Sequence, residues 1–100
     1  MPTTTLRDLK RFTFISGSGS IERREVCVMT AAALLAGLPF NDAPPCVCPV
    51  IRRLCIGLNY RIKNNATRKR LMLPLAAKVL GTRSTREVEI KRGFIAADAA

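Results

Sequence analysis

The stretch VCVMTAAALLAGLPF, residues 26–40, decides the fold that this sequence predicts. Within residues 26–36 only Thr30 is polar, so a helix here has no polar face and must be covered on all sides. Gly37 and Pro39 are residues that end such a helix. The apolar run is shorter than the roughly 20 residues that cross a bilayer. We therefore expect a buried central helix and no membrane span.

The composition favours helices that pack through aliphatic side chains. The chain has 100 residues, of which 48% are hydrophobic, with four Phe, one Tyr and no Trp. A chain of this length forms one domain with a modest core, and its aliphatic residues suit helix packing better than a β-sandwich. We predict an all-α fold, a compact bundle of about four short helices, with residues 21–100 as a single helical domain.

Residues 1–20 are predicted to be a flexible N-terminal arm. The arm ends in GSGS at residues 17–20, a composition typical of flexible joints. Two local structures are open for the arm, a short helix after Thr5 or a short strand over residues 12–15. Ser20 is the expected N-cap of the central helix.

A second helix is predicted over residues 49–62. Pro49 follows Cys48 and suits the first helical position, where a missing N–H costs nothing. At 100° per residue, one side of this helix is apolar and is the expected core face. That face consists of Val50, Ile51, Leu54, Cys55, Leu58 and Ile62.

Two more helices complete the predicted bundle. One runs over residues 66–80 with Asn65 as its cap, and Pro74 is expected to kink or split it. The other starts at the capping box STRE, residues 84–87. It carries two apolar lines, which indicates that it is wedged between elements or binds a partner. The expected buried stripe of the helix over residues 66–80 is Leu71, Leu75 and Val79.

The charge of the chain indicates a polyanionic partner. Seventeen Lys and Arg against seven Asp and Glu give a net charge of +10, which attracts nucleic acid or an acidic protein surface. No helix-turn-helix, zinc finger or aromatic stacking platform is recognisable. The candidate partner-binding residues lie on the second helix and in the residues that follow it, up to Arg70: Arg52, Arg53, Tyr60, Arg61, Lys63, Arg68, Lys69 and Arg70.

Four cysteines match the number that a tetrahedral zinc site requires, but their spacing does not. Zinc ligands usually come as C-x₂₋₄-C pairs, and this chain has only a C-x-C pair and two single cysteines. We predict no metal and no cofactor, with the thiols packed in the core or free. A disulfide would require an oxidising compartment. The residues concerned are Cys27, Cys46, Cys48 and Cys55.

The sequence offers no catalytic constellation. Histidine is absent, which removes the commonest general base and leaves a cysteine nucleophile without its usual partner. Cys48, near a helix N-terminus and one turn from Arg52, is the thiol whose pKa we expect to be lowered. The apolar run starts too late and after too many charges for a signal peptide. We predict a non-enzymatic protein of the cytoplasm.

Several ordered motifs resemble a group of small bacterial and phage proteins whose activity is not known. The segments CVMTAAALLAGLPFNDAPPCVCPVIRRLCIGLN, LPLAAKVLGTRS and KRGFIAADAA carry the resemblance over about residues 26–98. Members of the group look like C-x-M-E, then A-G, C-x-x-P-V-I, Asn-Asp, L-x-G-T and A-A-D-W-A. This chain has Thr30 in place of the Glu and Tyr60 in place of the Asp, and it ends at Ala100.

We predict a small basic binding module that contacts nucleic acid or a nucleic-acid-binding machine through its Arg and Lys surface. The alternative, which the phage resemblance suggests, is an interaction protein that blocks a host factor, or a homo-oligomeric structural protein. That alternative would use an exposed apolar line of the fourth helix together with Ile56 and Tyr60.

Overall fold

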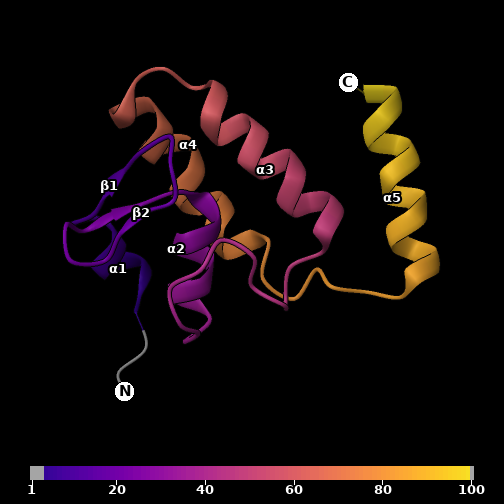
Figure 1. Cartoon of the computed structure of the whole chain (residues 1–100), viewed down its shortest axis with the longest axis horizontal. Coiled ribbons are helices and arrows are strands. Elements are labelled where there is room, and N and C mark those ends of the chain that lie inside the picture. Colours follow the sequence, from indigo (N-terminus) through magenta and orange to yellow (C-terminus); the bar gives the residue numbers. More distant parts are fainter. Residues whose placement is uncertain (1–3, 100) are drawn as a thin grey trace.

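The computed structural model describes the backbone of residues 4–99 and the side chains of residues 4–95. Over these residues the chain forms five helices and three short strands (Figure 1). The helices are α1 Leu6–Leu9, α2 Val28–Leu35, α3 Pro49–Arg61, α4 Asn65–Lys78 and α5 Arg86–Ala99, and the strands are β1 Thr13–Phe14, β2 Gly19–Ser20 and β3 Glu25–Val26.

The prediction of an all-α bundle with a flexible N-terminal arm is wrong, because the N-terminal quarter of the chain folds into a sheet. The strand order is β1-β3-β2, with β3 parallel to β1 and antiparallel to β2. Phe14 pairs with Val26, and both side chains are fully buried. Residues 4–20 supply the short helix and the short strand that the sequence left as alternatives. Thr5 caps that helix.

Gly19 explains how the last two residues of the GSGS segment form a strand. Its φ is +85°, and a Cβ at this position would lie 2.1 Å from the carbonyl oxygen of Glu25. Only glycine permits this close approach of β2 to β3. Ser20 therefore lies within β2. The prediction that Ser20 caps the central helix is wrong.

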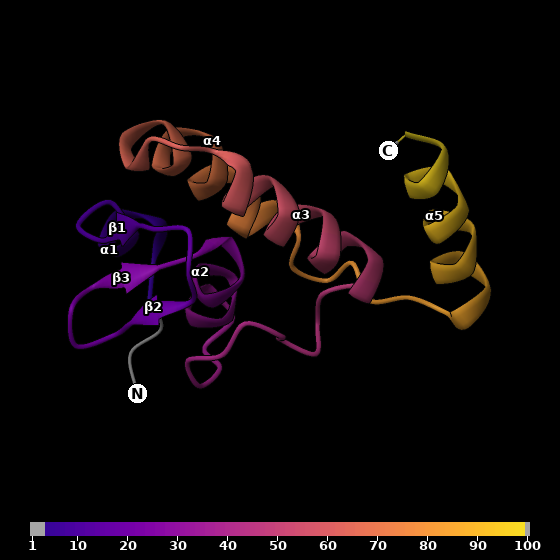
Figure 2. The same cartoon turned by 45° about the horizontal axis from the view of Figure 1, so that its top comes forward.

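The prediction of a buried central helix is confirmed in α2. Every side chain from Val28 to Leu34 is buried. The helix begins later than predicted, after its N-cap Cys27, since Val26 belongs to β3. Thr30 is satisfied inside the core because its hydroxyl donates to the carbonyl of Ser18 at 3.0 Å. Figure 2 shows α3 and α4 forming a layer above α2 and the sheet.

α3 begins at Pro49 after the N-cap Cys48, as predicted, but its core face differs from the prediction. Cys55 and Asn59 are buried against the layer below. Leu54 and Leu58, which the sequence placed in the core, are 47% and 49% exposed. The core face is therefore rotated toward the polar side of the predicted wheel.

α4 runs through Pro74 without being split, and its N-cap is Asn64. Its buried residues are Arg68, Met72 and Ala76, so the predicted stripe is displaced by one residue along most of the helix. Leu71 is about half exposed, and only Val79 of that stripe is buried.

α5 stands apart from the rest of the molecule in Figure 1, joined by the extended residues 81–85, and it packs mainly on α3. Gly93 of α5 lies at this contact, since a Cβ there would lie 3.9 Å from Cγ2 of Val50. The molecule is flat, with extents of 37 × 32 × 18 Å. None of the helices within residues 4–99 combines the length and the hydropathy that crossing a bilayer requires.

Candidate nucleic-acid interface

The net charge of the protein lies in one continuous segment of the sequence. Residues 43–86 contain no Asp or Glu, and the other seven Lys and Arg balance the seven acids of the chain. This segment covers α3, α4 and the connections around them. Its ten cations are Arg52, Arg53, Arg61, Lys63, Arg68, Lys69, Arg70, Lys78, Arg83 and Arg86.

A hollow of about 510 Å³ lies where α3 ends and the chain turns into α4. Four of the predicted binding residues line it, so the structure brings these together. Tyr60 is 74% exposed beside the hollow, and no acidic side chain lines it. We call it the Tyr60 hollow, and its lining residues are Ser16, Tyr60, Arg61, Ile62, Lys63 and Arg68.

Arg68 has a structural role, although it lines the Tyr60 hollow. It is 3% exposed, and its Nε donates to the carbonyl of Asn59 at 2.7 Å. Its terminal nitrogens also donate to the carbonyl of Ile62 and to Oδ1 of Asn65. A cation at the last carbonyls of a helix is favourable because of the helix dipole. The guanidinium therefore joins the end of α3 to the start of α4.

A second hollow, of about 240 Å³, lies at the other end of α3, between the loop that precedes it and the segment that leads to α5. It contains two of the predicted residues and Arg83, which the sequence analysis did not select. We call it the proline-arginine hollow. Its polar and proline lining consists of Pro44, Pro45, Pro49, Arg52, Arg53 and Arg83.

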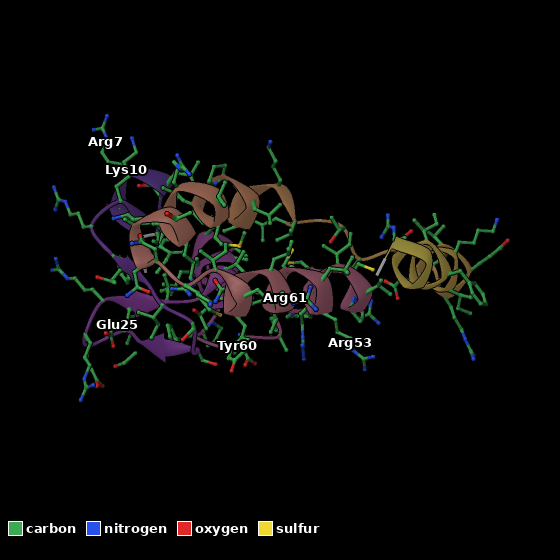
Figure 3. All side chains as sticks on the ribbon, turned by 90° about the horizontal axis from the view of Figure 1, so that it is seen from above. Arg7, Lys10, Glu25, Arg53, Tyr60 and Arg61 are labelled. Atoms are coloured by element: carbon green, nitrogen blue, oxygen red, sulfur yellow. The ribbon has the colours of Figure 1, made fainter. Side chains whose placement is uncertain are left out.

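The two hollows share one side of α3. Figure 3 shows Arg53 and Tyr60 extending from the same side of the helix. They are seven residues apart, which is two turns or about 10 Å along the axis. Arg61 follows Tyr60 at the end of the same helix. A strand of nucleic acid could thus contact both hollows.

Lys69 and Arg70 are on α4 and are not among the residues that line either hollow. The Nζ of Lys69 donates to the carbonyl of Lys10, next to α1. Figure 3 places Lys10 and Arg7 on the opposite side of the view from Arg53 and Tyr60. The structure therefore does not gather all the predicted residues on one face.

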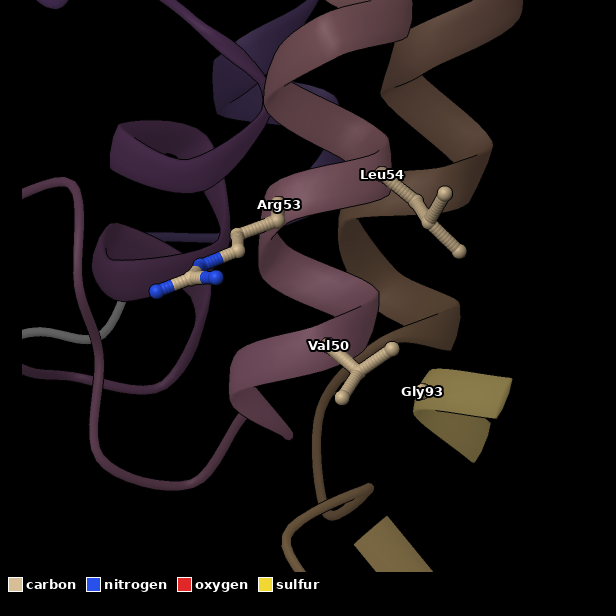
Figure 4. A pocket seen from close by; sticks show the side chains of 4 residues that line it. All are labelled: Val50, Arg53, Leu54 and Gly93. Atoms are coloured by element: carbon tan, nitrogen blue, oxygen red, sulfur yellow. The ribbon is translucent and has the colours of Figure 1, made fainter. Parts of the chain in front are cut away.

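An apolar hollow of about 270 Å³ separates α3 from α5. In Figure 4 Val50 and Leu54 point toward Gly93, whereas Arg53 extends away from them. Beyond this contact α5 remains exposed, because Phe94 is 71% exposed. This is the apolar surface that the alternative function would use.

Among residues 4–95, whose side chains the structure describes, no three Cys, His, Asp or Glu side chains lie close enough together to hold a metal ion. All four thiols are free. Cys27 caps α2 and Cys55 is in the core face of α3. Burial raises the pKa of Cys55.

Cys48 is the thiol with a lowered pKa, as the sequence predicted. Burial by itself raises this pKa, but the backbone N–H groups of Ile51 and Val50 and the guanidinium of Arg92 together lower it below its usual value, against the charge of Glu89. The cation is therefore Arg92 of α5 and not Arg52. The side chain of Cys48 is fully buried.

Arg83 could have been selected from the sequence because it lies within residues 43–86, the segment that contains no Asp or Glu. The predicted cations lie on the second helix and in the residues that follow it, whereas Arg83 lies on the segment before α5. Comparison of the chain with protein-family models, with curated proteins and with solved structures gave no match. The resemblance to small bacterial and phage proteins therefore depends on its motifs alone and stays a prediction.

Proposed function

We propose that this protein is a non-enzymatic nucleic-acid-binding module, with its binding surface on the side of α3 that carries Arg53 and Tyr60. The observation that carries the proposal is the Tyr60 hollow, in which an exposed aromatic ring stands beside Arg61 and Lys63 with no acidic side chain in the lining. Cationic side chains bind phosphates and supply most of the affinity for nucleic acid.

The exposed ring favours single strands over duplexes. A tyrosine face can stack on a base only where that base is unpaired, and stacking of this kind tolerates any sequence. Among the described residues, neither Arg53, Arg61 nor Lys63 forms an ion pair, so their charges are available to phosphates. We propose a cytoplasmic location as well, since free thiols suit a reducing compartment.

Salt titration of binding tests this function. Fluorescence anisotropy with a labelled single strand, at several salt concentrations, should give a linear fall of log affinity with log salt. The triple variant Arg53→Gln, Arg61→Gln, Lys63→Gln should bind more weakly and lose about 2 from the slope, since each phosphate contact on a single strand contributes about 0.7.

The matched control removes the same charge from another face. Arg7, Lys10 and Arg11 are exposed on and after α1, and their triple Gln variant should keep most of the slope. Equal losses in the two triple variants would mean that net charge alone attracts the strand. No measurable binding of the wild-type protein to either single or double strands would end the proposal.

The second candidate function is a protein-interaction module or homo-oligomer that uses α5. The observation that favours it is the exposure of Phe94 and Ile95, at 71% and 69%, on a helix that contacts little besides α3. Exposed apolar patches of this kind mark interaction sites. Light scattering would then show an oligomer that persists at high salt, and Phe94→Ser with Ile95→Ser would dissociate it.

A further inference from the structure

The proline-arginine hollow is a separate recess from the Tyr60 hollow, built by three segments of the chain. The backbone N–H of Arg83 donates to the carbonyl of Cys46 at 3.1 Å, which fastens the segment before α5 to the loop before α3. The backbone N–H of Cys48 donates to the hydroxyl of Thr82 at 2.9 Å and reinforces this junction. Arg83 is thus held beside Arg52 and Arg53, although about 30 residues separate them in sequence.

The walls of this recess are stiff. Pro44, Pro45 and Pro49 each have a fixed φ and no backbone N–H. Pro44 is also buried, and its carbonyl accepts from the N–H of Val47 at 3.1 Å. A preformed recess loses little conformational entropy when a ligand enters it.

The charge of the recess is close to +2. Nε of Arg83 lies 3.2 Å from Oε2 of Glu89, and this ion pair offsets one of the three guanidinium charges. Within the described residues, the side chains of Arg52 and Arg53 form no hydrogen bond or ion pair. A phosphate monoester carries nearly two negative charges at neutral pH, because its second pKa is about 6, whereas an internal phosphodiester carries one. Arginine forks bind phosphate oxygens in pairs.

The size of the recess also points to a terminal group. Pockets that enclose a whole small molecule usually measure about 300–1,000 Å³, and this recess measures about 240 Å³. It therefore suits a charged group at the end of a larger ligand. Tyr60 lies about 10 Å from Arg53 along α3, a distance that roughly three stacked nucleotides span at the 3.4 Å rise of one strand in B-form DNA.

We propose that the proline-arginine hollow binds the terminal phosphate of a nucleic-acid strand whose following bases reach Tyr60. The inference depends on the proposed function and adds a preference for strand ends. It also explains why Arg83, outside any helix, is fastened beside two arginines of α3.

Strands that differ only at their ends test the inference. Anisotropy would compare a labelled 12-nucleotide single strand with a 5′-phosphate, the same strand with a 3′-phosphate and the same strand with hydroxyls at both ends. Wild-type protein should bind one of the phosphorylated strands about tenfold more tightly, the effect of one added charged hydrogen-bonding group. In Arg83→Gln and in Arg52→Gln that gain should fall below about twofold, while Lys78→Gln, an exposed cation of α4, should keep it.

The outcomes separate the two proposals. Equal affinity for all three strands would overturn the terminal-phosphate site and leave the nucleic-acid function intact. Failure of every strand to bind would overturn both. Circular dichroism establishes that each variant is folded. Because Arg52→Gln keeps the ion pair between Arg83 and Glu89, it shows whether the loss of phosphate binding is independent of that ion pair. A phosphoserine peptide that binds more tightly than the phosphorylated strand would assign the recess to a protein ligand and overturn the inference.

Discussion

The Oδ1 of Asn59 accepts a hydrogen bond of 3.1 Å from the backbone N–H of Val28, the first residue of α2. The amide of Asn59 also donates to the carbonyl of Ile15 at 2.9 Å. A single buried side chain of α3 thus satisfies one orphan donor of the central helix and one carbonyl next to the sheet.

We expect Asn59→Leu to destabilise the protein by about 3 kcal/mol, because it buries two backbone polar groups without partners. Urea denaturation measures the change. The control is Asn64→Ala, which removes the exposed N-cap of α4 and should cost about 1 kcal/mol. A cost for Asn59→Leu no larger than that of the control would show that Asn59 does not join α2, α3 and the sheet.

The sequence predicts the elements whose signals are local. The apolar run before Gly37 predicts a buried helix, and Pro49 predicts the start of α3, because each depends on a few adjacent residues. The sheet escapes prediction because strands of two residues show no alternation. Asn59 and Arg68 escape for another reason. Residues of these types are mostly exposed, and their burial depends on carbonyls far along the chain.

The candidate site is predictable to a similar extent. Tyr60, Arg61 and Lys63 lie within one stretch of four residues and line one hollow. Residues so close in sequence can be predicted to act together from their positions alone. Arg83 joins Arg52 and Arg53 only through the path of the segment before α5. Such long-range convergence follows from tertiary structure, which a helix wheel does not contain.

Arg68 should be required for folding. Arg68→Met leaves the carbonyls of Asn59 and Ile62 unpaired at the end of α3, and we expect it to cost at least about 2 kcal/mol. Arg68→Lys should recover only part of this, since an ammonium group lacks the fork that reaches several acceptors. The control is Arg70→Met on the exposed side of α4, which should stay within about 0.5 kcal/mol. Equal stability of the two Met variants, measured by urea denaturation, would contradict the structural role.

Two glycines should respond in opposite directions to the same substitution. Gly57 is inside α3 with open space around its missing Cβ, so Gly57→Ala should stabilise by about 0.5–1 kcal/mol through helix propensity. Gly19→Ala should destabilise strongly, because its Cβ would collide with the carbonyl of Glu25 at a positive φ. Thermal denaturation followed by circular dichroism measures both. A neutral Gly19→Ala variant would argue against the β2 to β3 pairing.

Cys55 should make stability fall at alkaline pH. Burial raises its pKa above the ordinary 9.0, so the unfolded chain releases this proton at a lower pH than the folded protein does. Its contribution is therefore fully present below pH 9.0 and is lost as the pH rises through the folded pKa. Cys55→Ala removes this contribution to stability. The lowered pKa of Cys48 affects the wild-type protein and the variant equally, so it cancels in their difference. The difference in urea midpoint between wild type and Cys55→Ala should change between pH 8 and 10.5, and a constant difference would contradict the burial effect.

Tyr60 should contribute to nucleic-acid binding by stacking and not by charge. We expect Tyr60→Ala to weaken binding to a single strand by about 1–3 kcal/mol, the usual value of one base stacked on an aromatic ring, and Tyr60→Phe to bind nearly as wild type. The salt slope of Tyr60→Ala should equal that of wild type, because slope reports phosphate contacts. Phe94→Ala is the control, since this ring is equally exposed but lies on α5, away from the Tyr60 hollow. A reduced slope in Tyr60→Ala would show that the substitution disturbs Arg61 or Lys63, and equal weakening in Phe94→Ala would move the binding surface to α5.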